Sequence, residues 1–394
     1  MVTDLRPRAD GAVTEQRFFR RNYDFSLLAW RLLCAFAVSI PFSIFIAQTL
    51  LILTAIAAAL DWWGRRRPFP STPLDLPIAC FFGASLLAAF LGLDLLHSLW
   101  GLRTYLQIVI VYLVFAYATD LDRAFLLLRC FLVGSAITAS YTLLGALAPA
   151  VFTRLFLGQM TQSGQLLFAI GFTASMLLRD VFPQRLVRPA FALYVLALIV
   201  NLKRGAWFGV TATIVTIALL TSRRLLLAAA AVILLIVTAV SPVRERIANA
   251  TRDLFLPGNR YDIWAAAVDV VHRFPMGVGR KNGEILRDYA NIPQHHKHAH
   301  NNVLQITMES GYLGLATFLW WMGRFARLTW RSYRRVPPEE ARIQALAVAV
   351  LATFVGFHAA GLVEYNFGDS EVLEAFFVMM GLGLVVDRTT RRDA

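Results

Sequence analysis

Long apolar runs separated by short polar stretches recur along the chain from residue 26 to residue 386. A helix needs about 20 apolar residues to cross the core of a bilayer, and it satisfies its own backbone polar groups there. We therefore predict an all-α polytopic membrane protein with about 12 transmembrane helices. The predicted spans are residues 26–41, 43–60, 74–92, 104–119, 124–150, 164–179, 189–201, 206–221, 225–241, 301–323, 343–363 and 371–386.

One polar segment interrupts this pattern for much longer than the others. It covers residues 242–300 and separates nine predicted spans, within 26–241, from the last three, within 301–386. The two ends of the chain, residues 1–25 and 387–394, are polar. Basic residues concentrate in the short connections on one side, and short basic loops stay in the cytoplasm. We thus expect both termini in the cytoplasm and one large periplasmic loop at the polar segment.

Composition agrees with this assignment and excludes one class of partner. Hydrophobic residues make up 58% of the 394-residue chain and charged residues 16%, with a mean hydropathy of +0.58. A soluble protein carries about 25% charged residues. The net charge of +13 would suit nucleic acid, but the basic residues lie in short patches between apolar runs. Such patches determine topology, so we expect the lipid bilayer as a partner and no nucleic acid.

Lys203 and Arg204 break this charge rule, because they end a short span on the predicted outer face. Two interpretations stay open. Long basic side chains at a helix end can extend to the lipid headgroups. Alternatively, the pair binds an anion opposite the polar segment, which itself holds more basic than acidic residues. A surplus of guanidinium beside a membrane suits a lipid-linked phosphate or diphosphate, which arginine binds with a planar fork.

Within the polar segment, residues 258–264 predict the start of an amphipathic helix. Asn259 is a suitable N-cap, and Trp264 shares the apolar face with later valines. Arg260 then falls in the first turn, where the helix dipole disfavours a cation. It is either an exposed loop arginine or a residue with an anionic partner. Further on, the glycines of residues 275–279 predict a turn whose backbone approaches another part of the molecule.

A histidine cluster precedes the next apolar helix, at His295, His296, His298 and His300. These side chains could ligate a metal ion, but their spacing matches no standard zinc site and no cysteine is near. A general base is the better use of one of them, since neutral imidazole can take a proton from a hydroxyl near pH 7.

His300 stands at the start of the predicted helix, at the top of one of its faces. At about 100° per residue, Leu304, Thr307 and Gly311 fall below it, with Gly314 beside them. Small residues let a neighbouring helix approach closely. We expect such a contact to fix the direction in which the histidine points.

Several motifs follow one another in a characteristic order. They are Arg204-Gly205 after a short span, Arg260 with Trp264 four residues later, Gly277-Val278-Gly279, His300-Asn301 and then, after nine residues, Gly311-Tyr312-Leu313-Gly314. This order resembles that of O-antigen ligases and related bacterial O-oligosaccharyltransferases. Together with the layout of spans, the resemblance extends over essentially the whole chain.

The resemblance implies a GT-C-type glycosyltransferase with its active site on the periplasmic face of the bacterial inner membrane. It would transfer O-antigen polysaccharide from undecaprenyl diphosphate to a sugar hydroxyl of lipid A–core, with no metal ion or other cofactor. The implied roles are diphosphate binding by Arg204 and Arg260, with Lys203 beside them, and activation of the acceptor by His300. Supporting positions are Asn301, Tyr261, Trp264, His298, Gly311 and Gly314.

The residues fit this chemistry. A sugar diphosphate already has a good leaving group, so fixed arginines lower the barrier by neutralising the charge that develops on it. We expect direct displacement with inversion, because no carboxylate is placed as an obvious nucleophile; Asp262, Asp288 and Glu309 are the ones to examine. The alternatives are an O-antigen polymerase, a protein O-oligosaccharyltransferase and a transporter. Few charges lie inside the spans and no internal repeat is visible, which disfavours the transporter.

Overall fold

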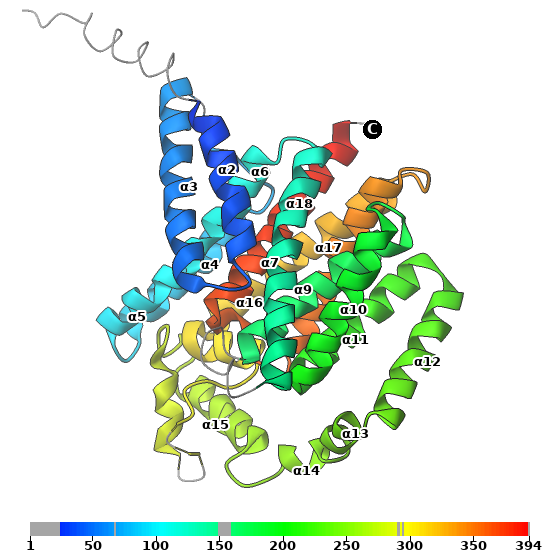
Figure 1. The fold of residues 1–394 in the computed structure, drawn as a ribbon. Helices are drawn as coiled ribbons and strands as arrows, with labels where there is room; N and C mark the ends of the chain where they lie inside the picture. The colour runs from blue at the N-terminus through cyan, green and yellow to red at the C-terminus, as the bar shows by residue number, and fades with distance from the viewer. Residues whose placement is uncertain (1–23, 67, 149–158, 290–291, 294, 393–394) are drawn as a thin grey trace, which may run out of the picture.

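The computed structural model describes residues 24–66, 68–148, 159–289, 292–293 and 295–392. Within these ranges all regular structure is helical, and no strand is present. The helices form a bundle with a layer of shorter helices across one end (Figure 1). Helix α17 lies in its interior, since 83% of its apolar window is buried, and it packs on α9, α11, α16 and α18.

The described helices are, in chain order, α2 (Phe25–Ser39), α3 (Ile44–Arg65), α4 (Asp75–Leu91), α5 (Leu95–Leu102), the 3-10 helix η1 (Arg103–Ile108), α6 (Val109–Tyr117), α7 (Leu121–Leu147), α9 (Gln159–Leu178), α10 (Gln184–Asn201), α11 (Arg204–Thr221), α12 (Arg223–Ala239), α13 (Ser241–Ala248), α14 (Ala250–Leu254), α15 (Arg260–Arg273), the 3-10 helix η2 (Asn282–Asp288), α16 (Asn302–Arg335), α17 (Ala341–Ala360), the 3-10 helix η3 (Asn366–Gly368) and α18 (Ser370–Arg392).

Among the described residues, six helical runs are long and apolar enough to cross a membrane. They are α3, the continuous run of α5, η1 and α6, then α7, α10, α11 and α17. A seventh is counted if α12 and α13, which are bent by 91°, form one span. Each predicted span overlaps a described helix, which confirms the all-α prediction. The count of twelve spans, the GT-C architecture and the orientation stay predictions.

Several helices extend beyond their predicted ends. Helix α5 begins directly after Asp94, whose side chain accepts a hydrogen bond from the His97 amide at 2.8 Å. The connection between the predicted spans 74–92 and 104–119 is therefore helical in this part. Helices α16 and α18 also continue past their predicted spans, because their basic last turns remain helical. In α18, Asp387 pairs with Arg391 one turn later at 2.8 Å, so the described part of the predicted C-terminal tail belongs to the helix.

The polar segment 242–300 forms the layer at one end of the bundle, where α13, α14 and α15 lie in Figure 1. The C-terminal end of α18 lies at the opposite end. Helix α15 begins where the sequence predicts, because the Asn259 side chain caps it by accepting a hydrogen bond from the Arg260 amide at 3.0 Å. Ile263 on its apolar face is buried in a small core together with Met308 of α16.

Helix α16 is broken at Gly311, whose backbone is left-handed with a φ of 68°. The glycine turn at residues 275–279 passes this point, and a Cβ on Gly311 would lie 2.4 Å from the carbonyl carbon of Met276. The predicted close approach is therefore present, but its partner is a turn and not a neighbouring helix. A Cβ on Gly314 would meet the Ser310 side chain of the same helix at 2.2 Å. The atoms nearest these two Cβ positions belong to the turn and to α16 itself, while the neighbouring helix α4 meets α16 one residue earlier, where the Ser85 and Ser310 hydroxyl groups lie 3.2 Å apart.

Candidate active site

Glu364, in the loop between α17 and α18, joins segments that are far apart in the chain. Its Oε1 accepts a hydrogen bond from Arg260 Nη2 at 2.8 Å, and its Oε2 lies 3.4 Å from His300 Nδ1. Gly205 packs against the same side chain, since a Cβ there would lie 2.5 Å from the Glu364 Cγ. Arg260, His300 and Gly205 are thus brought to one carboxylate.

His300 has a left-handed backbone, with a φ of 48°, which is uncommon for a residue with a side chain. The preceding residue is fixed on both sides. The Ala299 amide donates to Gln305 Oε1 at 2.7 Å, and the Ala299 carbonyl oxygen accepts from Trp264 Nε1 at 2.9 Å. Asn301 follows as the N-cap of α16. His300 therefore lies just before the helix, in a position that Trp264 and Asn301 help to fix.

Arg260 is the first residue of α15, and its side chain crosses to the loop after α17. Its Nη1 donates to the Val363 carbonyl oxygen, and its Nη2 donates to Glu364. The exposed fractions of the Arg260 and Glu364 side chains are 23% and 18%. The helix dipole favoured an anionic partner for Arg260, and in the structure this partner is Glu364.

Lys203 and Arg204 have different surroundings. The turn between α10 and α11 puts Leu202 in the left-handed region, with a φ of 59°, and Lys203 at the N-cap of α11. Lys203 lines a cavity, whereas Arg204 turns to α14 and donates to Asp253 Oδ2 at 2.9 Å. Arg204 keeps an exposed fraction of 34%. Of the two residues, the lysine that the sequence ranked second is the one that borders the cavity.

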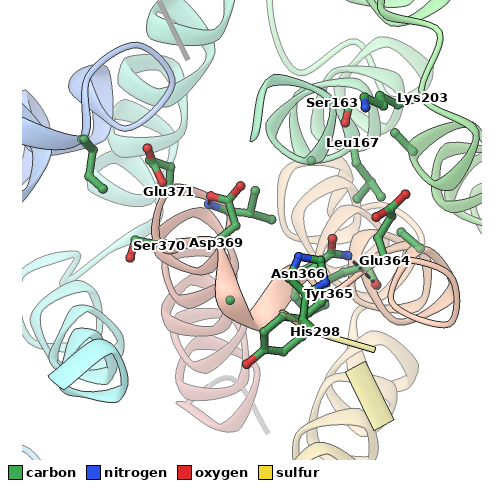
Figure 2. Close-up of a pocket in the computed structure, with 17 residues that line it drawn as sticks. Ser163, Leu167, Lys203, His298, Glu364, Tyr365, Asn366, Asp369, Ser370 and Glu371 are labelled. Carbon is green, nitrogen blue, oxygen red and sulfur yellow. Dashed lines mark hydrogen bonds between the residues drawn. The ribbon is translucent and has the colours of Figure 1, made fainter. Parts of the chain in front are cut away.

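The cavity has a volume of about 440 Å³ and lies among the ends of α9, α11, α17 and α18 (Figure 2). Glu364 borders it as well as contacting His300, so the cavity and the histidine share one carboxylate. Apolar side chains such as Leu167 and Phe357 form part of the wall. The polar lining residues are Ser163, Lys203, His298, Glu364, Tyr365, Asn366, Asp369, Ser370 and Glu371.

The polar lining differs in charge from one side to the other. Figure 2 shows Lys203 and Glu364 on one side, with His298 below them, and Asp369 and Glu371 on the other side. The first side offers a cation, a carboxylate and an imidazole. The second offers two carboxyl groups, which can form hydrogen bonds with hydroxyl groups. A ligand with an anionic end and a hydroxyl-rich end would fit this arrangement.

His298 and Glu364, which both lie next to His300, have shifted pKa values. Burial lowers the pKa of His298 to about 4, and the neighbouring His300 adds to this shift. Burial would raise the pKa of Glu364, but the contact with His300 and the charge of Arg260 outweigh it and hold that pKa below its usual value. At pH 7 Glu364 is therefore ionised and His298 is neutral.

The histidines of the cluster pack ring against ring. The ring centroids of His298 and His300 lie 4.2 Å apart, and those of His296 and His300 lie 5.6 Å apart. Their nitrogen atoms do not converge. In the part of the chain that the structure describes, no three His, Cys, Asp or Glu side chains are placed to hold a metal ion.

A second arginine–glutamate pair, Arg280 with Glu309, is buried beside the site, and both side chains have an exposed fraction of 2%. Arg280 also donates to the Tyr365 hydroxyl and, at 2.9 Å, to the Phe367 carbonyl oxygen. Gln305 donates to the other oxygen of Glu309 at 2.9 Å. The pair thus ties the glycine turn to α16 and to the loop that carries Glu364.

The carboxylates considered as nucleophiles have other surroundings. Asp262 accepts a hydrogen bond from the Gly258 amide at 2.7 Å, and Glu309 is held by Arg280. Asp288 is exposed, and it lines a different pocket from the one beside Glu364. None of the three borders the 440 Å³ cavity.

Sequence reasoning missed Glu364 and Arg280. A signal existed for both, since acidic residues crowd the short loop before the last apolar run, and Arg280 directly follows Gly-Val-Gly. Conversely, the predicted supporting residue Tyr261 is 56% exposed, and its ring packs on Phe255 with centroids 5.4 Å apart. It is not among the residues that hydrogen-bond to Glu364.

Comparison with known proteins agrees with the motifs. Residues 189–319 match the family described as "O-Antigen ligase", and this range contains Lys203, Arg204, Arg260 and His300. A protein of Rickettsia typhi named "Putative polysaccharide ligase" is 28% identical over 89 residues, and one of Rickettsia prowazekii with the same name is 27% identical over 89 residues. Each alignment covers 23% of this chain and only 18% of the relative. The resemblance to the O-antigen ligase superfamily is thereby confirmed.

Proposed function

We propose that this chain is an O-antigen ligase that transfers O-antigen polysaccharide from undecaprenyl diphosphate to a sugar hydroxyl of lipid A–core. The site faces the periplasm from the bacterial inner membrane, in a GT-C-type arrangement of twelve spans. One observation supports the proposal most. Arg260 and His300 meet at Glu364, against Gly205 and beside a cavity lined by Lys203. Cations for a diphosphate and a base for a hydroxyl are therefore neighbours.

Lys203, Arg204 and Arg260 bind the diphosphate of the donor in this proposal. The two arginines exchange their carboxylate partners, Asp253 and Glu364, for phosphate oxygens, which accept strong bidentate hydrogen bonds from guanidinium. Negative charge grows on the bridging oxygen as the bond from C1 breaks, and fixed cations stabilise it. Loss of one such contact typically costs about 2.7–4 kcal/mol in the transition state.

His300 acts as the general base. The acceptor hydroxyl gives its proton to the imidazole while its oxygen forms the new bond to C1 of the donor sugar. Undecaprenyl diphosphate leaves with the electron pair of the broken bond. This single displacement inverts the configuration at C1. The existing partners of Asp262 and Glu309 favour it over a covalent glycosyl-enzyme.

This scheme requires no metal ion or other cofactor, because basic side chains supply the positive charge at the leaving group. The carboxylates of Asp369 and Glu371, on the other side of the cavity, then face the sugar end of the donor. The same donor chemistry would serve an O-antigen polymerase or a protein O-oligosaccharyltransferase. The acceptor distinguishes these enzymes from a ligase.

The test is transfer by the purified full-length chain, supplied with undecaprenyl-diphosphate-linked glycan and lipid A–core in the presence of EDTA. We expect the glycan on lipid A–core, and the same yield with and without EDTA. Lengthening of the carrier-linked glycan with lipid A–core unchanged would replace the ligase by a polymerase, and glycan on a protein acceptor would indicate an O-oligosaccharyltransferase. Absence of transfer to every acceptor would contradict the proposal and favour a transporter.

A further inference from the structure

Glu364 has two oxygens, and the structure uses them for different partners. Oε1 accepts from Arg260 at 2.8 Å, a normal hydrogen-bond length, whereas Oε2 lies 3.4 Å from His300 Nδ1, at the long end of the range. Gly205 leaves no free space on the Cγ side. The carboxylate is therefore held in place, but its contact with the histidine is the weaker of the two.

The contact with Glu364 decides which nitrogen of His300 can accept a proton. A carboxylate beside Nδ1 favours the tautomer with its proton on that nitrogen, and this leaves the lone pair of Nε2 free. Ala299, fixed by Trp264 and Gln305, keeps the backbone of His300 in its left-handed conformation. Both the direction and the tautomer of the ring are thus set by neighbours.

The Arg260 side chain can give up its hydrogen bond to Glu364 and still be held by a second contact. Its Nη1 also donates to the Val363 carbonyl oxygen, and a guanidinium offers five N–H donors in total. A diphosphate has more negative charge than a carboxylate and matches the guanidinium fork better than one carboxylate oxygen does. A donor that binds here therefore competes with Glu364 for the Nη2 side of Arg260.

We propose that Glu364 is a positioning residue that couples donor binding to activation of the base: the donor diphosphate draws Arg260 away, and the carboxylate then acts on His300 alone. This inference rests on the proposed ligase reaction. The proton from the acceptor hydroxyl goes to Nε2 of His300, and Glu364 stabilises the imidazolium that forms. The base is then strongest when the donor is already bound. While no donor is present, His300 is a weaker base and activates less water.

The charged and titratable groups around His300 come from several elements. They are Glu364 from the loop after α17, Arg260 from α15, His296 and His298 from the same segment, and Lys203 in the wall of the adjoining cavity. Among these, Glu364 carries the only negative charge. Its removal must therefore make His300 harder to protonate.

The experiment compares the wild-type chain with Glu364→Gln, which keeps the size of the side chain and removes its charge. We expect kcat to fall by about 100-fold or more, since the histidine loses the partner that orients it. The KM for the donor should stay equal or fall, because Arg260 no longer has to leave a carboxylate. The acidic limb of the pH profile of kcat/KM should move to lower pH. Glu364→Asp, which keeps the charge, should recover part of kcat.

Glu284→Gln is the matched control. Glu284 lies in the same polar segment, is 52% exposed and pairs with Arg287 at 3.2 Å and with Lys297 at 3.3 Å, so its ion pairs do not include Arg260, His300 or Glu364. Its substitution should change neither kcat nor the pH profile. A Glu364→Gln enzyme with wild-type kcat and an unmoved acidic limb would overturn the role of Glu364. A lower yield of folded protein with a wild-type pH profile would also overturn it, since that result indicates a structural role.

If the variants do not fold, a measurement on the wild-type chain alone can test the coupling. The pH profile of kcat/KM for the donor reports the free enzyme, and that of kcat reports the bound state. We expect the acidic limb of kcat at the higher pH, because His300 gains the full effect of Glu364 only after the donor binds. Coincident limbs would refute the coupling. No transfer by the wild-type chain at any pH would instead count against the ligase reaction itself.

Discussion

Two arginine–glutamate pairs lie near each other in this protein and have opposite surroundings. Arg280 and Glu309 are each 2% exposed, and Tyr365, Gln305 and backbone groups also form hydrogen bonds with them, although the buried Arg280 Nε has no partner among the described residues. Arg260 and Glu364 are 23% and 18% exposed, and they border a cavity. The first pair is closed to any ligand. The second can exchange partners.

The different burial of the two pairs gives the same two residue types different roles. A buried ion pair is costly to break because the remaining charge stays without a partner. A pair at the edge of a cavity contributes little to stability, and each member remains available for a substrate. We therefore assign the Arg280 pair to the scaffold and the Arg260 pair to the reaction. The following predictions can break or sharpen this division.

The largest expected effect is on stability, from Glu309→Gln. This change leaves Arg280 charged and buried without a counter-charge, which costs about 3–5 kcal/mol of the free energy of unfolding. Unfolding in detergent by denaturant or heat measures this loss. The double variant with Arg280→Met should recover much of it, because both buried charges are then absent. Equal losses in the single and double variants would contradict the assignment.

The next effect is on catalysis, from Arg260→Gln. The transfer rate should fall by about 100- to 1,000-fold through loss of a contact to the developing charge. The free energy of unfolding should change by only about 1 kcal/mol, as for other partly exposed pairs. Arg273→Gln in the same helix is the control, since Arg273 is 66% exposed, pairs with Asp269 one turn earlier and lies over the ring of Tyr289, outside the cluster of Arg260, His300 and Glu364. If both variants retained the wild-type rate, Arg260 would belong to the scaffold as well.

A smaller loss of stability is expected from Gly311→Ala, where the glycine turn meets α16. A left-handed backbone costs about 1–2 kcal/mol for a residue with a Cβ, and that atom would also lie 2.4 Å from Met276. Gly323→Ala in the same helix is the control, because no atom lies within 4 Å of its Cβ position. It should be neutral or gain up to about 1 kcal/mol. Equal stability of the two variants would show that the turn does not rest on Gly311.

The smallest effect concerns acid stability and His298, whose pKa burial lowers to about 4 from an ordinary value of 6.5. Between these values the unfolded chain binds a proton that the folded chain does not, so stability falls as the pH drops from about 6.5 towards 4. His298→Gln should flatten this part of the curve. The free energy of unfolding at pH 7 and pH 5 measures it. An unchanged slope in the variant would show that His298 is not the group responsible.

The sequence predicted the parts of the fold that depend on local pattern. The apolar runs located the helices, Asn259 located the start of α15, and the glycines of residues 275–279 predicted a close backbone approach. The ends of α16 and α18 were placed too early, because charged residues mark where a span leaves the membrane and do not by themselves end a helix. Hydropathy therefore shows which residues suit the membrane interior, but it does not show at which residue a helix begins or ends.

The site was predicted only in part because its centre depends on contacts between distant residues. Glu364 lies 64 residues from His300 and 104 residues from Arg260 along the chain. No local pattern relates these positions, so the sequence shows that acidic residues crowd this loop but not which of them joins His300 to Arg260. For the same reason the sequence could not place Lys203 at the cavity and Arg204 beside Asp253.

The most direct test of the account is the rate of glycan transfer by His300→Gln, measured on folded protein whose unfolding matches the wild type. His300 is held by its backbone and touches Glu364 only at 3.4 Å, so we expect stability to change little. Loss of the general base should lower the rate by about 100- to 10,000-fold. A variant that is folded and transfers glycan at the wild-type rate would contradict a base at this position and the active site built around it.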